Sequence, residues 1–181
     1  MEFDLHNSIA LLERTPPALN ALLRSLPEAW TKQNEGDGTM APFDVIDHLA
    51  FLERNSWMQR LELILQGDEH QVFQPVNRQG RATGDAERSL PRLLDEFADL
   101  RAANLNTLRG LNLQPSDLTK RALHPSFGPV TAAQLLATWT THDMTHLHQI
   151  SRVLAHQYSE AVGPWIKFLG VLHCNGHSEP A

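Results

Sequence analysis

Apolar residues recur every three or four positions in four long segments of the chain, a spacing that places them on one face of a helix. The first segment, residues 4–25, contains Pro16 and Pro17, which predict a kink or break because each proline removes a backbone hydrogen-bond donor. The second segment spans residues 42–65, with a proline in its first turn and Gly67 just beyond its end. The first part of the chain is therefore expected to be helical.

The same spacing continues through the second half of the chain. The third segment spans residues 85–108, and Gly110 follows it as an expected terminator. The fourth, residues 131–158, begins at a threonine, and Gln134 three residues later completes a capping-box pattern. A shorter apolar segment, residues 163–173, predicts one further helix.

The segments between these helices are polar, and runs of alternating β-branched residues are absent. Residues 34–39 and 67–84 are expected to be loops because they are polar and contain glycine. Four long amphipathic helices without strands predict an all-α fold, a four-helix bundle with a short extra C-terminal helix. A chain of 181 residues fits one domain, which we place at residues 1–175, with a flexible tail at 176–181.

Two histidines interrupt the apolar face of the fourth segment. His142 and His146 are four residues apart, so they project within roughly 40° of each other around the helix axis. They share that face with Trp139 and Ile150. His48 holds a comparable place in the second segment, in line with a valine and a leucine. If both faces point into the bundle, the three imidazole rings meet there.

Neutral imidazole is a good ligand for zinc, nickel, iron or copper, with a zinc–nitrogen distance of about 2.0–2.1 Å. Three protein ligands would leave a coordination position for water or substrate, as in catalytic sites. Hydrogen-bonded core histidines would produce the same pattern, and a pair spaced by four also arises by chance among ten histidines. Burying three unpartnered imidazoles is costly, which favours ligands. The residue pattern alone leaves both interpretations open.

Two polar residues near these histidines are candidates for catalysis. Asp44 lies one turn before His48, where it would serve as a general base or as a partner of the ring. The simpler explanation of Asp44 is an acidic residue that stabilises the N-terminus of its helix. Gln149 is placed to orient the ring of His146, although a buried amide with other hydrogen bonds explains it equally well.

Other metal-ligating side chains are placed less favourably. Asp143 lies roughly 100° around the helix from its histidine neighbour, and His148 is expected at the surface or in a subunit contact. Residues 173–177, with the sequence HCNGH, also space two histidines by four, with the thiol of Cys174 between them. The glycine and the nearby chain end disfavour a rigid site in this segment.

The charge, the N-terminal residues and the single cysteine argue against several classes of partner and location. The formal net charge is −6, and no run of lysine or arginine suggests a nucleic-acid-binding face. The first residues lack the pattern of a secretory signal, and no segment approaches the roughly 18 apolar residues of a membrane span. The one cysteine, Cys174, cannot form an internal disulfide, which suits a reducing compartment. We therefore expect a cytoplasmic protein without nucleic-acid or membrane partners.

Five segments, in chain order, resemble the DinB-like (damage-inducible) metal-binding four-helix proteins. They are residues 11–16 (LLERTP), 43–49 (FDVIDHL), 124–131 (HPSFGPVT), 139–150 (WTTHDMTHLHQI), and the GPW and FL of residues 163–169. The resemblance implies one metal-ligating histidine on the second helix and two, four residues apart, on the fourth. In this sequence these are His48, His142 and His146.

The same resemblance implies an enzyme, because its members include bacillithiol-dependent S-transferases and a mycothiol-dependent isomerase. We expect a divalent metal, zinc or nickel first and iron or manganese as alternatives, that activates a thiol or water to attack a small molecule. The activity would be that of a transferase if a low-molecular-weight thiol attacks, and of a hydrolase if water attacks. The competing hypothesis is a non-enzymatic bundle that binds a metal or a small ligand. Members are often dimeric, so a homodimer is also expected.

Overall fold

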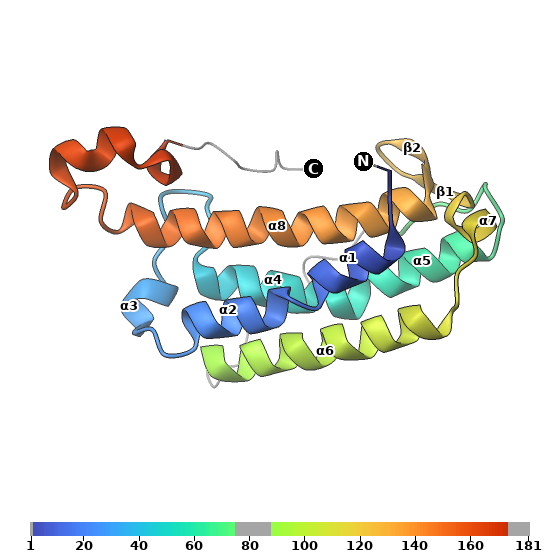
Figure 1. Cartoon of the computed structure of the whole chain (residues 1–181), viewed down its shortest axis with the longest axis horizontal. Coiled ribbons are helices and arrows are strands. Elements are labelled where there is room, and N and C mark those ends of the chain that lie inside the picture. Colours follow the sequence, from blue (N-terminus) through green and yellow to red (C-terminus); the bar gives the residue numbers. More distant parts are fainter. Residues whose placement is uncertain (1, 75–87, 174–181) are drawn as a thin grey trace.

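Four long helical stretches lie side by side along the molecule (Figure 1). The computed structural model describes residues 2–74 and 88–173. The stretches are α1 (Leu5–Leu12) with α2 (Thr15–Leu23), α4 (Pro42–Asn55) with α5 (Trp57–Leu65), α6 (Leu90–Gly110) and α8 (Ala132–His156). This arrangement confirms the predicted all-α four-helix bundle.

Two of the four stretches consist of two helices each; the break in the first was predicted from Pro16 and Pro17, and the break in the second was not. Pro16 and Pro17 sit in the first turn of α2, where a missing N–H removes no intrahelical bond, so the chain breaks just before them. In the second stretch Ser56 leaves the helical backbone region, with φ −138° and ψ −66°. Neither proline nor glycine marks Ser56, and the prediction of one continuous helix was therefore wrong.

A short β-hairpin precedes α8, and the prediction of a fold without strands missed it. Strand β1 (Arg121–His124) pairs antiparallel with β2 (Gly128–Thr131), and Gly128 takes a φ of 72° at the turn. Each strand is only four residues long, too short for an alternating pattern to stand out. Thr131, the last residue of the hairpin, is the N-cap of α8. Its hydroxyl accepts a hydrogen bond from the backbone N–H of Gln134 at 3.1 Å. The predicted capping box is confirmed.

The helix ends agree with the sequence pattern in part. Gly67, with a φ of 79°, follows the end of α5 as predicted. Helix α6 runs through Gly110, and the left-handed residue beyond it is Asn112 with a φ of 45°, so the predicted terminator was wrong. Helix α6 starts at Leu90; the start predicted at residue 85 lies outside the described residues.

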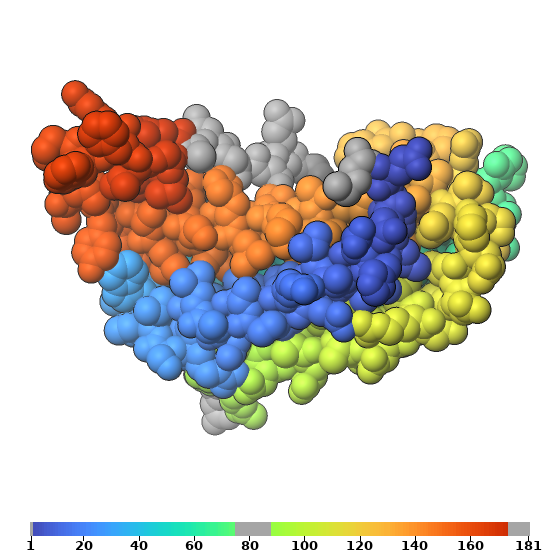
Figure 2. All heavy atoms as spheres, in the orientation of Figure 1, coloured from blue at the N-terminus to red at the C-terminus, as the bar shows by residue number. Residues whose placement is uncertain are grey.

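The segment predicted as a final α-helix forms two short 3-10 helices, η2 (Gly163–Phe168) and η3 (Gly170–Leu172). Leu169, with φ −102° and ψ 78°, separates them and interrupts the predicted continuous helix. This segment stands at one end of the molecule and the hairpin at the other (Figure 2). The tail predicted at residues 176–181 lies outside the described residues.

Two further one-turn helices, α3 (Glu28–Thr31) and α7 (Pro115–Leu118), lie in the connections between the long helices. Neither was predicted, because four residues are too few to show helical spacing. None of the helices in the described part of the chain combines the length and apolar character that a bilayer crossing demands.

Buried apolar side chains form two clusters, and α8 carries a band of buried polar residues between them. Trp139 belongs to one cluster, together with Ala122 of the hairpin, and Ile150 belongs to the other. Between these two positions on α8, Asp143 and His146 are both buried. Buried polar groups are rare in proteins unless they are paired, so this band needs partners from the other helices.

Candidate metal centre

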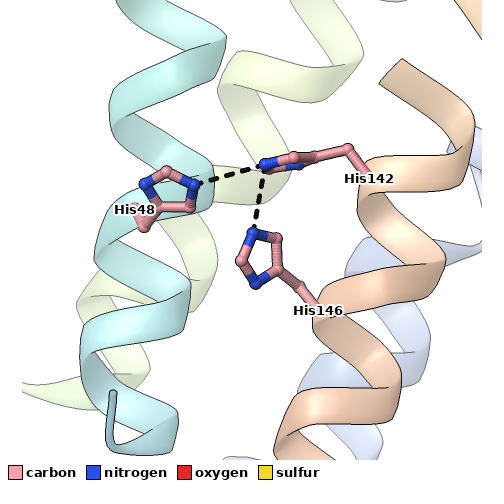
Figure 3. A group of neighbouring side chains, drawn as sticks. All are labelled: His48, His142 and His146. Carbon is pink, nitrogen blue, oxygen red and sulfur yellow. Dashed lines mark hydrogen bonds between the residues drawn. The ribbon is translucent and has the colours of Figure 1, made fainter. Parts of the chain in front are cut away.

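The three predicted histidines meet inside the bundle. His48 projects from α4, and His142 and His146 project from consecutive turns of α8 toward it (Figure 3). The Nε2 atoms of His48 and His142 are 3.3 Å apart, and those of His142 and His146 are 3.1 Å apart. One ligand atom from each ring lies within 4.8 Å of the other two. The structure thus brings all three side chains to a common point, as the sequence pattern predicts.

The separations between these nitrogens fit a shared metal ion. At a metal–nitrogen distance of about 2.0–2.1 Å, two ligands at a tetrahedral angle lie roughly 3.3 Å apart. The observed 3.3 Å and 3.1 Å are close to this value. The donor set, imidazole nitrogen alone, suits zinc, nickel, copper or iron.

Gln149 favours one tautomer of the neutral His146 ring. Its side-chain oxygen lies 2.8 Å from Nδ1 of His146. An amide oxygen only accepts hydrogen bonds, so Nδ1 carries the ring proton, and Nε2 presents a lone pair to the centre of the cluster. Gln149 therefore lies at hydrogen-bonding distance from the His146 ring, the neighbour that the sequence analysis considered for it.

The surroundings keep His142 and His146 neutral, which is the form that binds metal. Burial, followed by the neighbouring charges of His146, His48 and Arg101, lowers the pKa of His142 to about 2. Burial also lowers the pKa of His146, and the bond to Gln149 opposes that shift only in part. Both rings are therefore unprotonated at neutral pH.

The Nδ1 atom of His142 is buried and has no hydrogen-bond partner among the described residues. If the ring proton sits on Nδ1, a buried N–H is unpaired and the Nε2 lone pairs of His142 and His146 face each other. If the proton sits on Nε2 instead, a buried lone pair is left on Nδ1. A cation at the common point would remove the repulsion in the first arrangement, so the geometry of the rings fits a metal.

Asp44 occupies the N-terminus of α4, and its carboxylate accepts from the backbone N–H of Ala41 at 3.1 Å. This is the helix-stabilising role that the sequence favours for an acidic residue there. His148 is partly exposed on α8. In the competing segment 173–177, the ring of His173 lies 2.8 Å from the carbonyl oxygen of Ile166, and the other residues lie outside the described part of the chain.

The sequence analysis missed a buried ionic cluster next to the histidines. Arg101 of α6 forms ion pairs with Glu53 of α4 and Asp143 of α8, and all three side chains are buried. A usable signal was present, because Arg101 stands between Phe97 and Leu105 on the apolar face of its helix. A charged residue in such a position requires a buried partner.

The fold is thus a four-helix bundle that encloses a cluster of three imidazoles able to share a metal ion. The family model of the DinB superfamily matches residues 11–150, so the chain belongs to this superfamily. The resemblance noted in the sequence is thereby confirmed. A comparison with curated proteins found no match.

Two solved structures share the fold. YfiT from Bacillus subtilis, described as a probable metal-dependent hydrolase with an unusual four-helix bundle topology, is 20% identical, with a TM-score of 0.69. The match covers 88% of this chain and 87% of YfiT. TT2238, described as a four-helix bundle protein, is 22% identical, with a TM-score of 0.57, and the match covers 82% of this chain and 98% of TT2238.

Proposed function

We propose that this protein is a divalent-metal-dependent enzyme in which His48, His142 and His146 hold one metal ion. The convergence of the three Nε2 atoms on one point carries the proposal. When bound, the ion would lower the pKa of a coordinated water or thiol toward neutrality and so generate a nucleophile. The substrate would be a small molecule.

The side chains around the cluster have separate tasks in this proposal. Gln149 keeps the proton of His146 on Nδ1, so that Nε2 stays available as a ligand. His146 is buried, whereas His48 and His142 are partly exposed, so the site is reached from their side. Asp44 lies one turn from His48 and is our candidate for the general base, in addition to its bond to the helix N-terminus.

A hydrolase and a thiol transferase differ in the nucleophile alone. The description of YfiT supports water, and the resemblance to bacillithiol S-transferases supports a low-molecular-weight thiol. Zinc and nickel are the expected metals, with iron or manganese as alternatives. The remaining elements of the proposal are a cytoplasmic location and a homodimer. The competing function is non-enzymatic binding of a metal or small ligand.

The test begins with elemental analysis of purified protein, followed by loading with zinc, nickel or manganese. Hydrolysis is assayed with activated esters, and transfer with small thiols plus epoxides or alkyl halides. We expect the His142→Ala variant to lose bound metal and turnover, and the His148→Ala variant, altered on the same helix outside the cluster, to keep both. Turnover by His142→Ala at the wild-type rate would rule out the metal-centred reaction. Stoichiometric metal without turnover in any assay would favour the binding function.

A further inference from the structure

The buried ionic cluster of Arg101, Glu53 and Asp143 has no part in the function described so far. Their exposed fractions are 1%, 4% and 0%. Burial raises the pKa of Glu53, and the surrounding donors offset that rise only in part. Three desolvated charges are costly to bury, and they are tolerated where every hydrogen-bonding group is satisfied. The three charges lie on three different helices, α6, α4 and α8.

The guanidinium of Arg101 joins the two helices that carry the histidines. Its Nε and Nη2 donate to Oε1 of Glu53 on α4 at 3.0 and 2.8 Å. Its Nη1 and Nη2 donate to the two carboxylate oxygens of Asp143 on α8 at 2.6 and 3.0 Å. Nη1 also donates to the carbonyl of Leu12 in α1 at 2.9 Å. One side chain of α6 thus holds α1, α4 and α8 at once.

The two carboxylates lie close to the candidate ligands in the sequence. Asp143 adjoins His142 on α8, and Glu53 follows His48 by five residues on α4. A helix advances about 1.5 Å per residue, so sliding α4 past α8 by one residue would break these short ion pairs. The same slide would separate the Nε2 atoms of His48 and His142, now 3.3 Å apart. The ion pairs therefore constrain the helix register on which the site depends.

A chain of ring contacts connects the ionic cluster to His142. The guanidinium of Arg101 lies 5.3 Å from the ring centroid of Trp139, and the Trp139 indole N–H donates to Glu53 at 2.9 Å. Trp139 stacks on Trp57 with centroids 5.7 Å apart. Trp57 in turn meets His142 edge to face, with centroids 5.4 Å apart.

This chain of contacts accounts for a difference between the two histidines of α8. Metal-binding histidines usually have their second nitrogen held by a hydrogen bond, as Gln149 holds His146. Among the described residues, His142 has no such partner at Nδ1. The orientation of its ring must come from packing, and the Trp57 ring supplies that contact.

We propose that Arg101 is a positioning residue for the metal site. Through Glu53 and Asp143 it sets the register of α4 against α8, and through Trp139 and Trp57 it holds the ring of His142. This inference rests on the proposed metal-binding function.

The test compares Arg101→Lys, which keeps the charge but not the forked geometry, with Leu108→Ala. Leu108 is buried on the same helix, seven residues beyond Arg101, so its truncation controls for a general loss of stability. Zinc affinity is measured by competition with a chromophoric chelator at a temperature where all proteins are folded. Co²⁺ absorption in the visible range reports the coordination geometry.

We expect Arg101→Lys to bind zinc about tenfold more weakly than the wild type and to alter the Co²⁺ spectrum, since supporting contacts typically carry such effects. Leu108→Ala should leave both unchanged. A loss below threefold in Arg101→Lys, or an equal loss in both variants, would overturn the inference. If Arg101→Lys does not fold, Trp139→Phe, which removes the bond to Glu53 and reduces the ring that stacks on Trp57, is judged by the same threefold limit. Wild-type protein that binds no metal would instead overturn the proposed function and the inference with it.

Discussion

The two histidines of α8 have different neighbours that contact and orient their rings. His146 receives its tautomer from a hydrogen bond to Gln149, 2.8 Å away. The His142 ring packs against the ring of Trp57, and its Nδ1 lacks a hydrogen-bond partner within the described chain. Both rings are kept neutral by burial, which lowers the pKa of each. Each neutral ring has one unprotonated nitrogen that can bind a metal cation, and neither ring is readily protonated in the folded protein. The folded site thus prefers a metal cation to protons.

This preference predicts that the metal-free protein loses stability in mild acid. In the unfolded chain, His142 binds a proton below the ordinary pKa of 6.5, whereas in the folded protein its pKa is about 2. The unfolded state thus binds more protons between these values, and stability present above pH 6.5 falls as the pH decreases. Each such ring contributes a slope of at most about 1.4 kcal/mol per pH unit. Urea unfolding of chelator-treated protein between pH 7.5 and 4.5 measures it.

His142→Leu is the matched comparison for this slope, because leucine has no proton to bind. The variant should show a shallower decrease of unfolding free energy with acid than the wild type. The same slope in both proteins would mean that the His142 ring is accessible to protons in the folded state.

At the level of single residues, the sequence predicted the cluster of three histidines and missed the ionic cluster beside it. Three histidines on apolar helical faces are conspicuous because burial of an imidazole is costly. Arg101 is equally out of place on its own apolar face, yet its partners Glu53 and Asp143 lie on other helices. Helical spacing describes one helix at a time, so pairing between helices cannot be read from it.

At the level of the elements, the long helices were predictable and the irregular joints were not. A 25-residue helix such as α8 offers many turns of apolar spacing, and its capping box marks its start. The break at Ser56 and the four-residue strands carry no comparable signal. These features are decided by packing against the rest of the fold, which local patterns do not contain.

The start of α8 provides a prediction at this scale. Thr131→Ala removes the hydroxyl that accepts a hydrogen bond from the backbone N–H of Gln134, so the free energy of unfolding should fall by about 1 kcal/mol. Denaturant unfolding monitored by circular dichroism measures the difference. Thr138→Ala, an exposed position on the same helix, is the control and should cost nothing, because alanine favours helix. Equal losses in the two variants would contradict a capping contribution.

For the whole molecule, the bundle consists of two apolar clusters with a polar band across α8 between them. Within this band Arg101 forms ion pairs with residues of α4 and α8 and donates a hydrogen bond to a backbone carbonyl of α1. The histidine cluster joins α4 to α8 in the same band, so an ion bound there would connect helices that are far apart in the sequence. Binding of the ion and folding of the bundle should therefore be coupled.

That coupling predicts stabilisation of the whole fold by metal. A ligand that binds only the folded state adds about 2.7 kcal/mol to the unfolding free energy at a free concentration of 100 times its Kd. Thermal unfolding of chelator-treated protein, with zinc added stepwise, should show a midpoint that rises with concentration and returns when chelator is added again. His48→Ala should abolish the rise, and His148→Ala, outside the cluster, should retain it. If the His48→Ala midpoint rose as much as that of the wild type, zinc would be stabilising the protein from another site, such as the segment 173–177.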